Sequence, residues 1–126
     1  MKTIVRTASA PAPIGPYSQA VKAGNLMFCS GMIALDPVTG HLSNESVSAE
    51  AKQAMNNIGA LLKEAGVTFD HIVKTSIFLT TMDDFAAVNE VYGSFFTDHF
   101  PARETVAVAG LPKNARVEIS VTVLLP

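Results

Sequence analysis

Two charged residues near the C-terminal end of the chain, Arg103 and Glu118, have types and surroundings suited to chemistry on a small acid. Arg103 follows Pro101 by two positions and opens an alternating, strand-like run that Pro112 closes, since proline favours extended backbone at the residue before it. Glu118 lies in the run 116–124, where valine or isoleucine recurs at every second position, so its side chain should point away from the apolar face. A guanidinium holds a carboxylate through two parallel hydrogen bonds, and a nearby glutamate can activate water or transfer a proton.

The pattern around Arg103 and Glu118 leaves two interpretations open. If their strands are neighbours joined by the Pro-Lys-Asn turn at residues 112–114, both side chains could serve one cleft. The same pattern is also typical of a surface arginine and a solvent-facing carboxylate, because most charged side chains are exposed.

The composition predicts one domain, residues 1–126, that associates with copies of itself. The chain carries 9 Lys and Arg against 11 Asp and Glu, a net charge of −2, and it has no basic cluster, so nucleic acid binding is not expected. Hydrophobic residues make up 48% and charged residues only 16%, which indicates apolar surface that an oligomer would cover. No apolar run approaches the roughly 20 residues of a membrane span, so no membrane association is expected.

The single cysteine, Cys29, cannot form a disulfide within the chain, which fits a reducing compartment such as the cytoplasm. It lies in the apolar run 26–30, so we expect a buried and unreactive thiol. His41, His71 and His99 lack the spacing of metal ligands, and no phosphate-binding or dinucleotide-binding glycine motif is present. We therefore predict that no metal and no bound cofactor is needed.

The N-terminal part predicts a short strand, a connector and a hairpin. Residues 2–6 form the strand, and the proline-rich residues 10–16 form a stiff connector on the surface of the fold. The hairpin spans residues 19–30, with Gly24-Asn25 as its turn. Its second arm should end at Ser30-Gly31, where glycine lets another group approach the backbone.

Residues 48–65 predict an amphipathic helix packed on a sheet. Its apolar stripe repeats at spacings of three and four and consists of Ala51, Met55, Ile58, Leu62 and Ala65. Glu50 and the other polar residues should cover the remaining sides of the helix. Ser46 or Ser48 can cap its start, and Gly66 suits a left-handed cap at its end.

A strand over 71–80 and a second helix that begins at Thr81 follow. The strand is apolar on both faces, which predicts a central strand or one that meets another subunit. Its two faces are Val73, Ile77 and Leu79 against Ile72 and Phe78. The helical stripe is Phe85, Val88, Tyr92 and Phe95. Asn89 lies at the edge of this stripe, either exposed to solvent or directed into a cleft.

The complete order is strand, hairpin, helix, strand, helix, strand, strand. This order predicts an α+β fold in which two helices pack on one face of a mixed β-sheet.

Several motifs resemble those of the reactive intermediate deaminase (RidA/YjgF) family, in the family's order and approximate spacing over nearly the whole chain. They are Ile14-Gly-Pro-Tyr-Ser-Gln-Ala20, Ser30-Gly31, Ile72-Val-Lys-Thr75, Val88-Asn89, Phe100-Pro-Ala-Arg103, the Val-Ala-Val-Ala run with Leu111-Pro112, and Val117-Glu-Ile. The resemblance implies a chorismate-mutase-like fold and a homotrimer with clefts between its subunits.

The resemblance also implies an activity, the cofactor-independent hydrolysis of 2-iminopropanoate and 2-iminobutanoate to 2-oxo acids and ammonia. In that activity Arg103 would anchor the carboxylate and Glu118 would activate water or transfer a proton. Further residues that match the family's pocket-lining positions are Tyr17, Ser30, Gly31, Asn89 and Thr105.

Three residues depart from the pattern of well-known deaminase members. Thr105 replaces a cysteine, Gly110 stands where close relatives carry arginine, and Met32 stands where they carry glutamine. These departures bear on substrate preference more than on the reaction. The alternative is a non-catalytic protein that binds a small carboxylate as a signal, or a regulator of the translation-inhibitor type.

Overall fold

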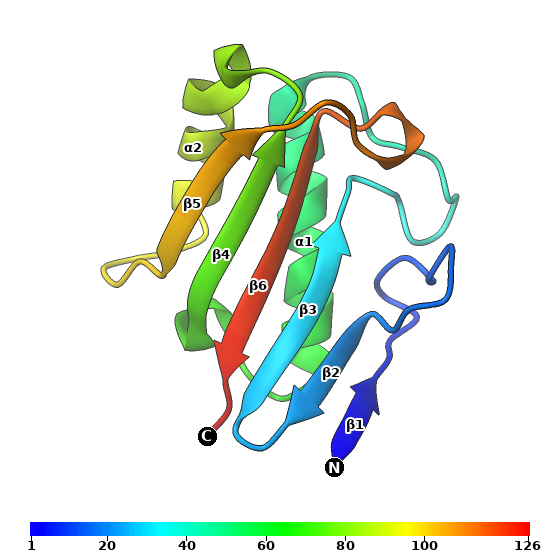
Figure 1. Cartoon of the computed structure of the whole chain (residues 1–126), viewed down its shortest axis with the longest axis vertical. Helices are drawn as coiled ribbons and strands as arrows, with labels where there is room; N and C mark the ends of the chain where they lie inside the picture. The colour runs from blue at the N-terminus through cyan, green and yellow to red at the C-terminus, as the bar shows by residue number, and fades with distance from the viewer.

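The computed structural model describes all residues from 1 to 126 and contains a six-stranded mixed sheet with both helices on one face (Figure 1). The strands are β1 (Lys2–Val5), β2 (Ala20–Ala23), β3 (Leu26–Met32), β4 (Ile72–Leu79), β5 (Ala102–Ala107) and β6 (Val117–Leu124). The helices are α1 (Val47–Glu64) and α2 (Phe85–Gly93), and short 3₁₀ turns precede β4, α2 and β6. The predicted α+β class and the order of its elements are confirmed.

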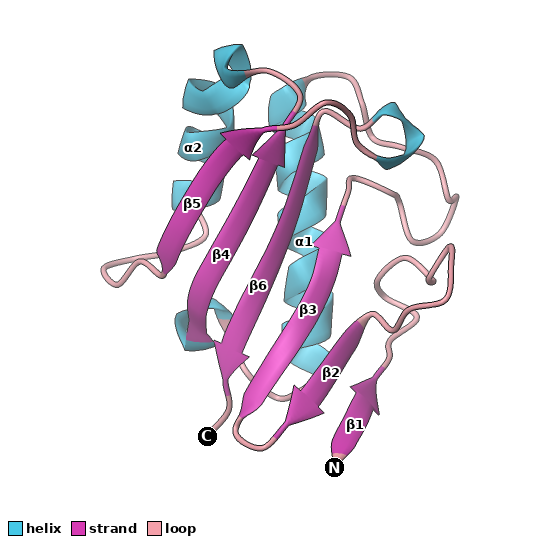
Figure 2. Ribbon diagram, viewed as in Figure 1, coloured by secondary structure: helices cyan, strands magenta, loops and turns pink.

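The strands lie in the order β1-β2-β3-β6-β4-β5, so β4 separates β5 from β6 (Figure 2). Of the two interpretations that the sequence leaves open, the one in which the strands of Arg103 and Glu118 are direct neighbours is therefore wrong. Residues 108–116 carry the chain across the end of β4 instead of turning back tightly, and the Val108 N–H donates to the Leu79 carbonyl on the way (2.7 Å). Because β4 pairs in parallel with β5 and antiparallel with β6, the sheet is mixed.

Helix α1 packs its apolar stripe against the sheet as predicted. Its fully buried residues include Ala51, Met55, Ile58 and Leu62. Ser46 caps the first turn by accepting a hydrogen bond from the Ala49 N–H (3.0 Å), and Gly66 adopts a left-handed conformation (φ +75°) just after the helix ends. Neither helix combines the length and the apolar character that crossing a membrane requires.

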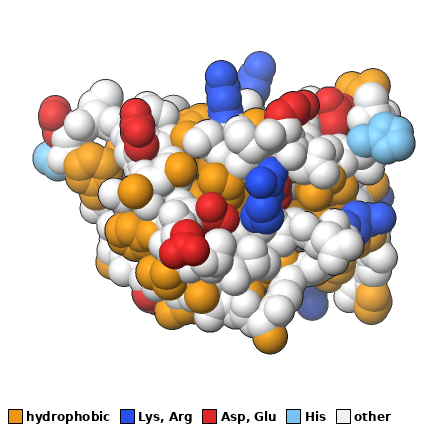
Figure 3. Space-filling view, turned by 90° about the horizontal axis from the view of Figure 1, so that it is seen from above, with side chains coloured by type: hydrophobic (Ala, Val, Ile, Leu, Met, Phe, Trp, Pro, Cys, Tyr) orange, Lys and Arg blue, Asp and Glu red, His pale blue; other side chains and the backbone are white.

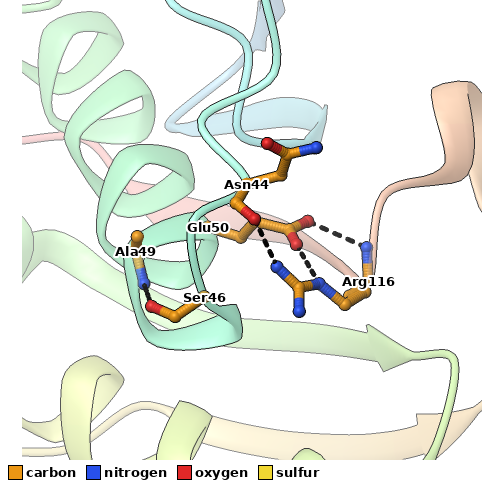
Figure 4. Close-up of polar contacts among 5 residues, drawn as sticks. All are labelled: Asn44, Ser46, Ala49, Glu50 and Arg116. Carbon is orange, nitrogen blue, oxygen red and sulfur yellow. Dashed lines mark hydrogen bonds and ion pairs between the residues drawn. The ribbon is translucent and has the colours of Figure 1, made fainter.

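The prediction that Glu50 covers an outer side of α1 is wrong, because this side chain is fully buried and its carboxylate points toward Arg116 (Figure 4). One carboxylate oxygen accepts from the backbone N–H of Arg116 (2.9 Å), and the other pairs with the Arg116 guanidinium. A second N–H of that guanidinium donates to the Asn44 carbonyl (2.8 Å). A buried charge is tolerated when it is paired and hydrogen-bonded, and here the partner comes from a distant part of the chain. Arg116 thus ties the loop before α1 to the start of β6, two residues before Glu118.

Strand β4 buries only one of its faces within the chain. Ile77 and Leu79 point toward the helices and are at most 1% exposed, whereas Val73 is 42% exposed. The predicted place of Val73 on the face of Ile77 is therefore wrong. The register of β4 against β6 shifts between Ile72 and Lys74, and an irregularity of this kind turns a side chain outward.

The sheet face without helices stays open in the chain and carries large apolar side chains. Phe28 of β3 and Val106 of β5 are 46% and 44% exposed, and Phe78 of β4 lies level with Val106. Exposed apolar side chains that gather on one face of a sheet are typical of a protein interaction site.

Strands β3 and β6 lie side by side at the centre of the sheet. The alternation predicted for β6 is confirmed, with Val117, Ile119, Val121 and Val123 buried. Strand β3 continues to Met32, beyond its predicted end at Ser30-Gly31, because its register shifts and the strand resumes after the irregularity. Cys29 is buried as predicted, and burial raises the pKa of its thiol to about 12, so the thiol stays protonated and unreactive.

Candidate functional site

A cavity of about 320 Å³ opens beside Glu118, where the N-terminal connector, the end of β3 and the turn before β6 meet. Four of the predicted site residues line it, namely Tyr17, Ser30, Gly31 and Glu118. The sequence reasoning missed most of the apolar lining, which consists of Pro11, Ala12, Ile14, Ile33, Leu35 and Pro112. These residues lie mainly outside regular elements, so no periodicity marks them. Met32, one of the three departures from the family pattern, also lines this cavity.

Gly31 lets the Glu118 carboxylate lie directly against the backbone of β3. A Cβ atom at Gly31 would come within 2.6 Å of Glu118 Oε2 and 2.7 Å of its Cδ, so a larger residue would displace the glutamate. Burial raises the pKa of the Glu118 carboxyl, and no cation or hydrogen-bond donor offsets this effect. The carboxyl therefore holds its proton to a higher pH than an exposed glutamate does, a change in the direction that suits a general acid or base.

Gln19 fixes the connector that forms one wall of the cavity. This side chain is only 3% exposed; its oxygen accepts from the Thr7 N–H (2.8 Å), and its amide donates to three carbonyls between residues 7 and 11. Ser30 links the same wall to β3, because its N–H donates to the Gln19 carbonyl (2.9 Å) and its hydroxyl to the Ser18 carbonyl (2.6 Å). The sequence pattern does not mark Gln19, since a single polar residue beside a short strand gives no sign of burial.

Tyr17 lines the cavity from the connector with 47% of its side chain exposed. Its hydroxyl oxygen accepts from the Ile14 N–H (3.2 Å), so its own proton remains available to a ligand.

Arg103 faces a second cleft, of about 470 Å³, on the helix side of β5. Its guanidinium donates to Asn89 Oδ1 (2.7 Å), and its Cζ atom lies 5.2 Å from the ring centroid of Tyr92 and 5.7 Å from that of Phe85. No carboxylate of the chain pairs with Arg103, since the two ion pairs present involve other residues. Asn89, for which the sequence left two possibilities, lines this cleft. Phe85, predicted for the apolar stripe of the helix, is 37% exposed and contacts Arg103.

Thr105 follows Arg103 by two residues on the same face of β5. Its hydroxyl is buried and has no hydrogen-bond partner in the chain. Buried hydroxyls almost always have such a partner, so a ligand or a second chain is the natural candidate to supply one. Gly110, another departure from the family pattern, is exposed with open space around its Cα.

Arg103 and Glu118 lie on opposite faces of the sheet. Arg103 is level with Thr75 of β4, which is fully buried beneath the helices, and Glu118 is level with Phe78 on the open face. The two positions are also separated by two strand spacings and by three residues along β4, about 10 Å in each direction. One chain therefore holds the predicted site residues in two separate groups. The first group is Tyr17, Ser30, Gly31 and Glu118, and the second is Asn89 and Arg103, with Thr105 two residues further along the same face of β5.

Charged side chains of both signs are scattered among hydrophobic ones on the face shown in Figure 3, with no continuous basic area. A surface that binds nucleic acid needs clustered Lys and Arg to neutralise phosphates. This face therefore offers no electrostatic footprint for a nucleic acid.

The chain is similar to known proteins along nearly its whole length. Residues 7–125 match the family described as Endoribonuclease L-PSP. A RutC family protein of Synechocystis is 50% identical over 98% of this chain and 96% of that protein. The human 2-iminobutanoate/2-iminopropanoate deaminase is 46% identical over 94% of this chain and 87% of its own. The crystal structure of E. coli TdcF with bound serine matches with a TM-score of 0.93 at 38% identity, over 98% of this chain and 99% of that one.

Proposed function

The chain belongs to the Endoribonuclease L-PSP family, the family of the YjgF and RidA proteins, and from this premise we propose that it hydrolyses reactive 2-imino acids to 2-oxo acids and ammonia. The name of the human relative specifies 2-iminobutanoate and 2-iminopropanoate, which supports short-chain imino acids as substrates here as well. Such a reaction requires an anchor for the carboxylate and a group that moves protons between water and the imine nitrogen.

The observation that carries the proposal is the unpaired guanidinium of Arg103. Its orientation is fixed by Asn89 and by two aromatic rings, yet no carboxylate of the chain neutralises it. A planar guanidinium in this state is suited to a bidentate grip on a substrate carboxylate. Thr105, whose buried hydroxyl lacks a partner, stands beside this anchor as a further contact for the substrate.

Glu118 is the proton-transfer group in this proposal. Its carboxylate accepts a proton from water as the water oxygen bonds to the imine carbon, and it passes that proton to the nitrogen. A second transfer, from the new hydroxyl to the amino group, forms the carbonyl and releases ammonia. The raised pKa of the Glu118 carboxyl supports this role, because both its protonated and its ionised form are used.

The catalytic cleft in this proposal is completed between two chains. Arg103 and Glu118 of one chain lie on opposite faces of the sheet and cannot both reach one small acid. If each cleft takes Glu118 from one copy and Arg103 from the next, the contact is head-to-tail, and such contacts form a ring when the rotation between successive copies closes. We propose the homotrimer that the family resemblance implies, with the open apolar sheet face covered by neighbouring copies.

A second candidate is the binding of a small carboxylate without turnover. The structure of E. coli TdcF with bound serine is the observation that favours it, since the Arg103 group alone would suffice for such a ligand. Binding alone requires no group that transfers protons, whereas a carboxyl lines the first cavity. Glu118 therefore favours the enzyme.

The test is a coupled assay in which a serine or threonine dehydratase generates the imine, and 2-oxo acid formation is followed with and without this protein. We expect Arg103→Ala to lower the acceleration by about 100-fold or more, because the substrate loses its orientation. Arg6→Ala is the matched control, since Arg6 is exposed and lines neither cleft. Full activity of Arg103→Ala would contradict the anchor role, and pyruvate binding without any acceleration would favour the second candidate.

A further inference from the structure

Three residues around the guanidinium of Arg103 contact one another in a ring: Arg103 itself, Thr75 and Tyr92. The backbone of Arg103 on β5 pairs in register with Thr75 on β4. The hydroxyl of Tyr92 donates to Thr75 Oγ1 (2.9 Å), and both residues are buried. The Tyr92 ring lies in turn under Arg103, with 5.2 Å between its centroid and Cζ. The position of the ring is therefore tied to the same strand pair that carries the arginine.

The Tyr92 ring has little freedom to rotate or tilt. It packs against the ring of Phe96, with 4.9 Å between centroids, in addition to its hydrogen bond with Thr75. Burial raises the pKa of the Tyr92 hydroxyl, so that the hydroxyl keeps the proton that it donates.

Two more residues of α2 complete the surroundings of the guanidinium. Phe85, Asn89 and Tyr92 follow one another at spacings of four and three, so they lie on one face of the helix. The Phe85 ring centroid lies 5.7 Å from Arg103 Cζ, and Asn89 accepts a single N–H. The remaining N–H groups of the guanidinium have no acceptor in the chain.

We propose that Phe85 and Tyr92 are positioning residues for substrate binding, which hold the plane of the Arg103 guanidinium so that its free N–H groups meet the substrate carboxylate. This inference rests on the proposed function, because it takes Arg103 as the anchor. A bidentate contact requires the guanidinium and the carboxylate to share a plane, and a free arginine side chain samples many orientations. Two cation–π contacts and the Asn89 bond restrict this sampling before the substrate arrives, so less conformational freedom is lost on binding.

The test measures the affinity of the assembled protein for pyruvate by calorimetry, so its result does not depend on turnover. Phe85→Leu should raise the Kd about three- to fivefold, because it removes one ring at a partly exposed position. Phe85→Tyr keeps a ring and should restore wild-type affinity. The double variant Tyr92→Phe with Thr75→Val removes the hydrogen bond without leaving either hydroxyl unpaired, and it should also raise the Kd, by a smaller factor.

Two further readouts distinguish positioning from a general loss of structure. The turnover number at saturating imine should stay near the wild-type value in Phe85→Leu while KM rises. The NMR signal of the Arg103 Nε–H should exchange with water faster in Phe85→Leu than in the wild type, because the guanidinium moves more freely.

The outcomes separate this inference from the proposal on which it rests. If Arg103→Ala binds pyruvate as tightly as the wild type, the anchor fails and the inference fails with it. If Arg103→Ala loses binding while Phe85→Leu and the double variant keep wild-type affinity, the positioning role alone is overturned.

Discussion

The residues around Arg103 and those around Glu118 have different effects on the charged group that they enclose. Around Arg103, contacts from α2 fix the orientation of a side chain that stays charged at every physiological pH. Around Glu118, the missing side chain of Gly31 makes room for the carboxylate, and burial raises the pKa of the carboxyl. An anchor needs constant charge and geometry, whereas a proton-transfer group needs an adjustable proton affinity. The two surroundings match these two needs.

The two groups also lie on opposite faces of one sheet, so Arg103 and Glu118 of one chain cannot both contact the same small substrate. If the roles are divided between chains, two variants that are each inactive must be able to complement each other in a mixed assembly.

We predict that Arg103→Ala and Glu118→Gln, unfolded and refolded together in equal amounts, regain about a quarter of the wild-type activity in the coupled assay. The reason is statistical: each cleft needs an intact Arg103 from one copy and an intact Glu118 from the next. Each variant refolded by itself is the control and should remain inactive. A mixture as inactive as its components would contradict a cleft shared between chains.

The close contact between Gly31 and the Glu118 carboxylate should make turnover sensitive to a larger residue at position 31. We expect Gly31→Ala to lower the turnover number by about 100-fold, because the added methyl group must displace the carboxylate by roughly an ångström or more. The affinity for pyruvate should change much less, since the Arg103 group is untouched.

Gly110→Ala is the matched control for Gly31→Ala. Gly110 has no atom within 4 Å of the position that an added methyl group would take, and its backbone is not left-handed, so its substitution should leave the turnover number unchanged. A Gly31→Ala protein with wild-type turnover would mean that Glu118 tolerates displacement and is not the proton-transfer group.

The parts of the fold that follow from local periodicity could be predicted from the sequence. The stripe of α1 and the alternation of β6 are properties of neighbouring residues, and both are confirmed. The order of the strands could not be predicted, because nothing local says that the chain after β5 crosses over β4. The burial of Glu50 escaped prediction for the same reason, since its partner Arg116 is distant in the sequence.

The candidate site could likewise be predicted only in part, because its geometry depends on segments that are distant in the sequence. Residue types and the family resemblance selected Arg103 and Glu118, but the face on which each side chain lies depends on the strand order. Helical spacing places Phe85 in the apolar stripe, because such spacing reveals which side of a helix is apolar and not what covers that side. Its contact with Arg103 depends on where β5 docks beside α2.

The burial of the Glu118 carboxyl should also make the stability of the fold depend slightly on pH. Because burial raises the pKa of the Glu118 carboxyl, the folded protein binds its proton more tightly than the unfolded chain does. The free energy of unfolding should therefore fall as the pH rises from the ordinary carboxyl pKa of 4.5 through the raised value. Glu118→Gln removes this cost, so it should be more stable than the wild type at neutral pH and equal to it below the ordinary pKa.

Asp36→Asn is the control of opposite sign for Glu118→Gln. Backbone N–H groups of Thr39 and Val38 lower the pKa of the Asp36 carboxyl, so its ionised form stabilises the folded state above the ordinary value of 3.8. This variant should be less stable than the wild type at neutral pH, and the difference should fade as the pH falls below 3.8. Urea unfolding at a series of pH values measures both. If Glu118→Gln lost stability at neutral pH as Asp36→Asn does, the Glu118 carboxylate would be stabilised by its surroundings, and its assignment as a proton-transfer group of raised pKa would fail.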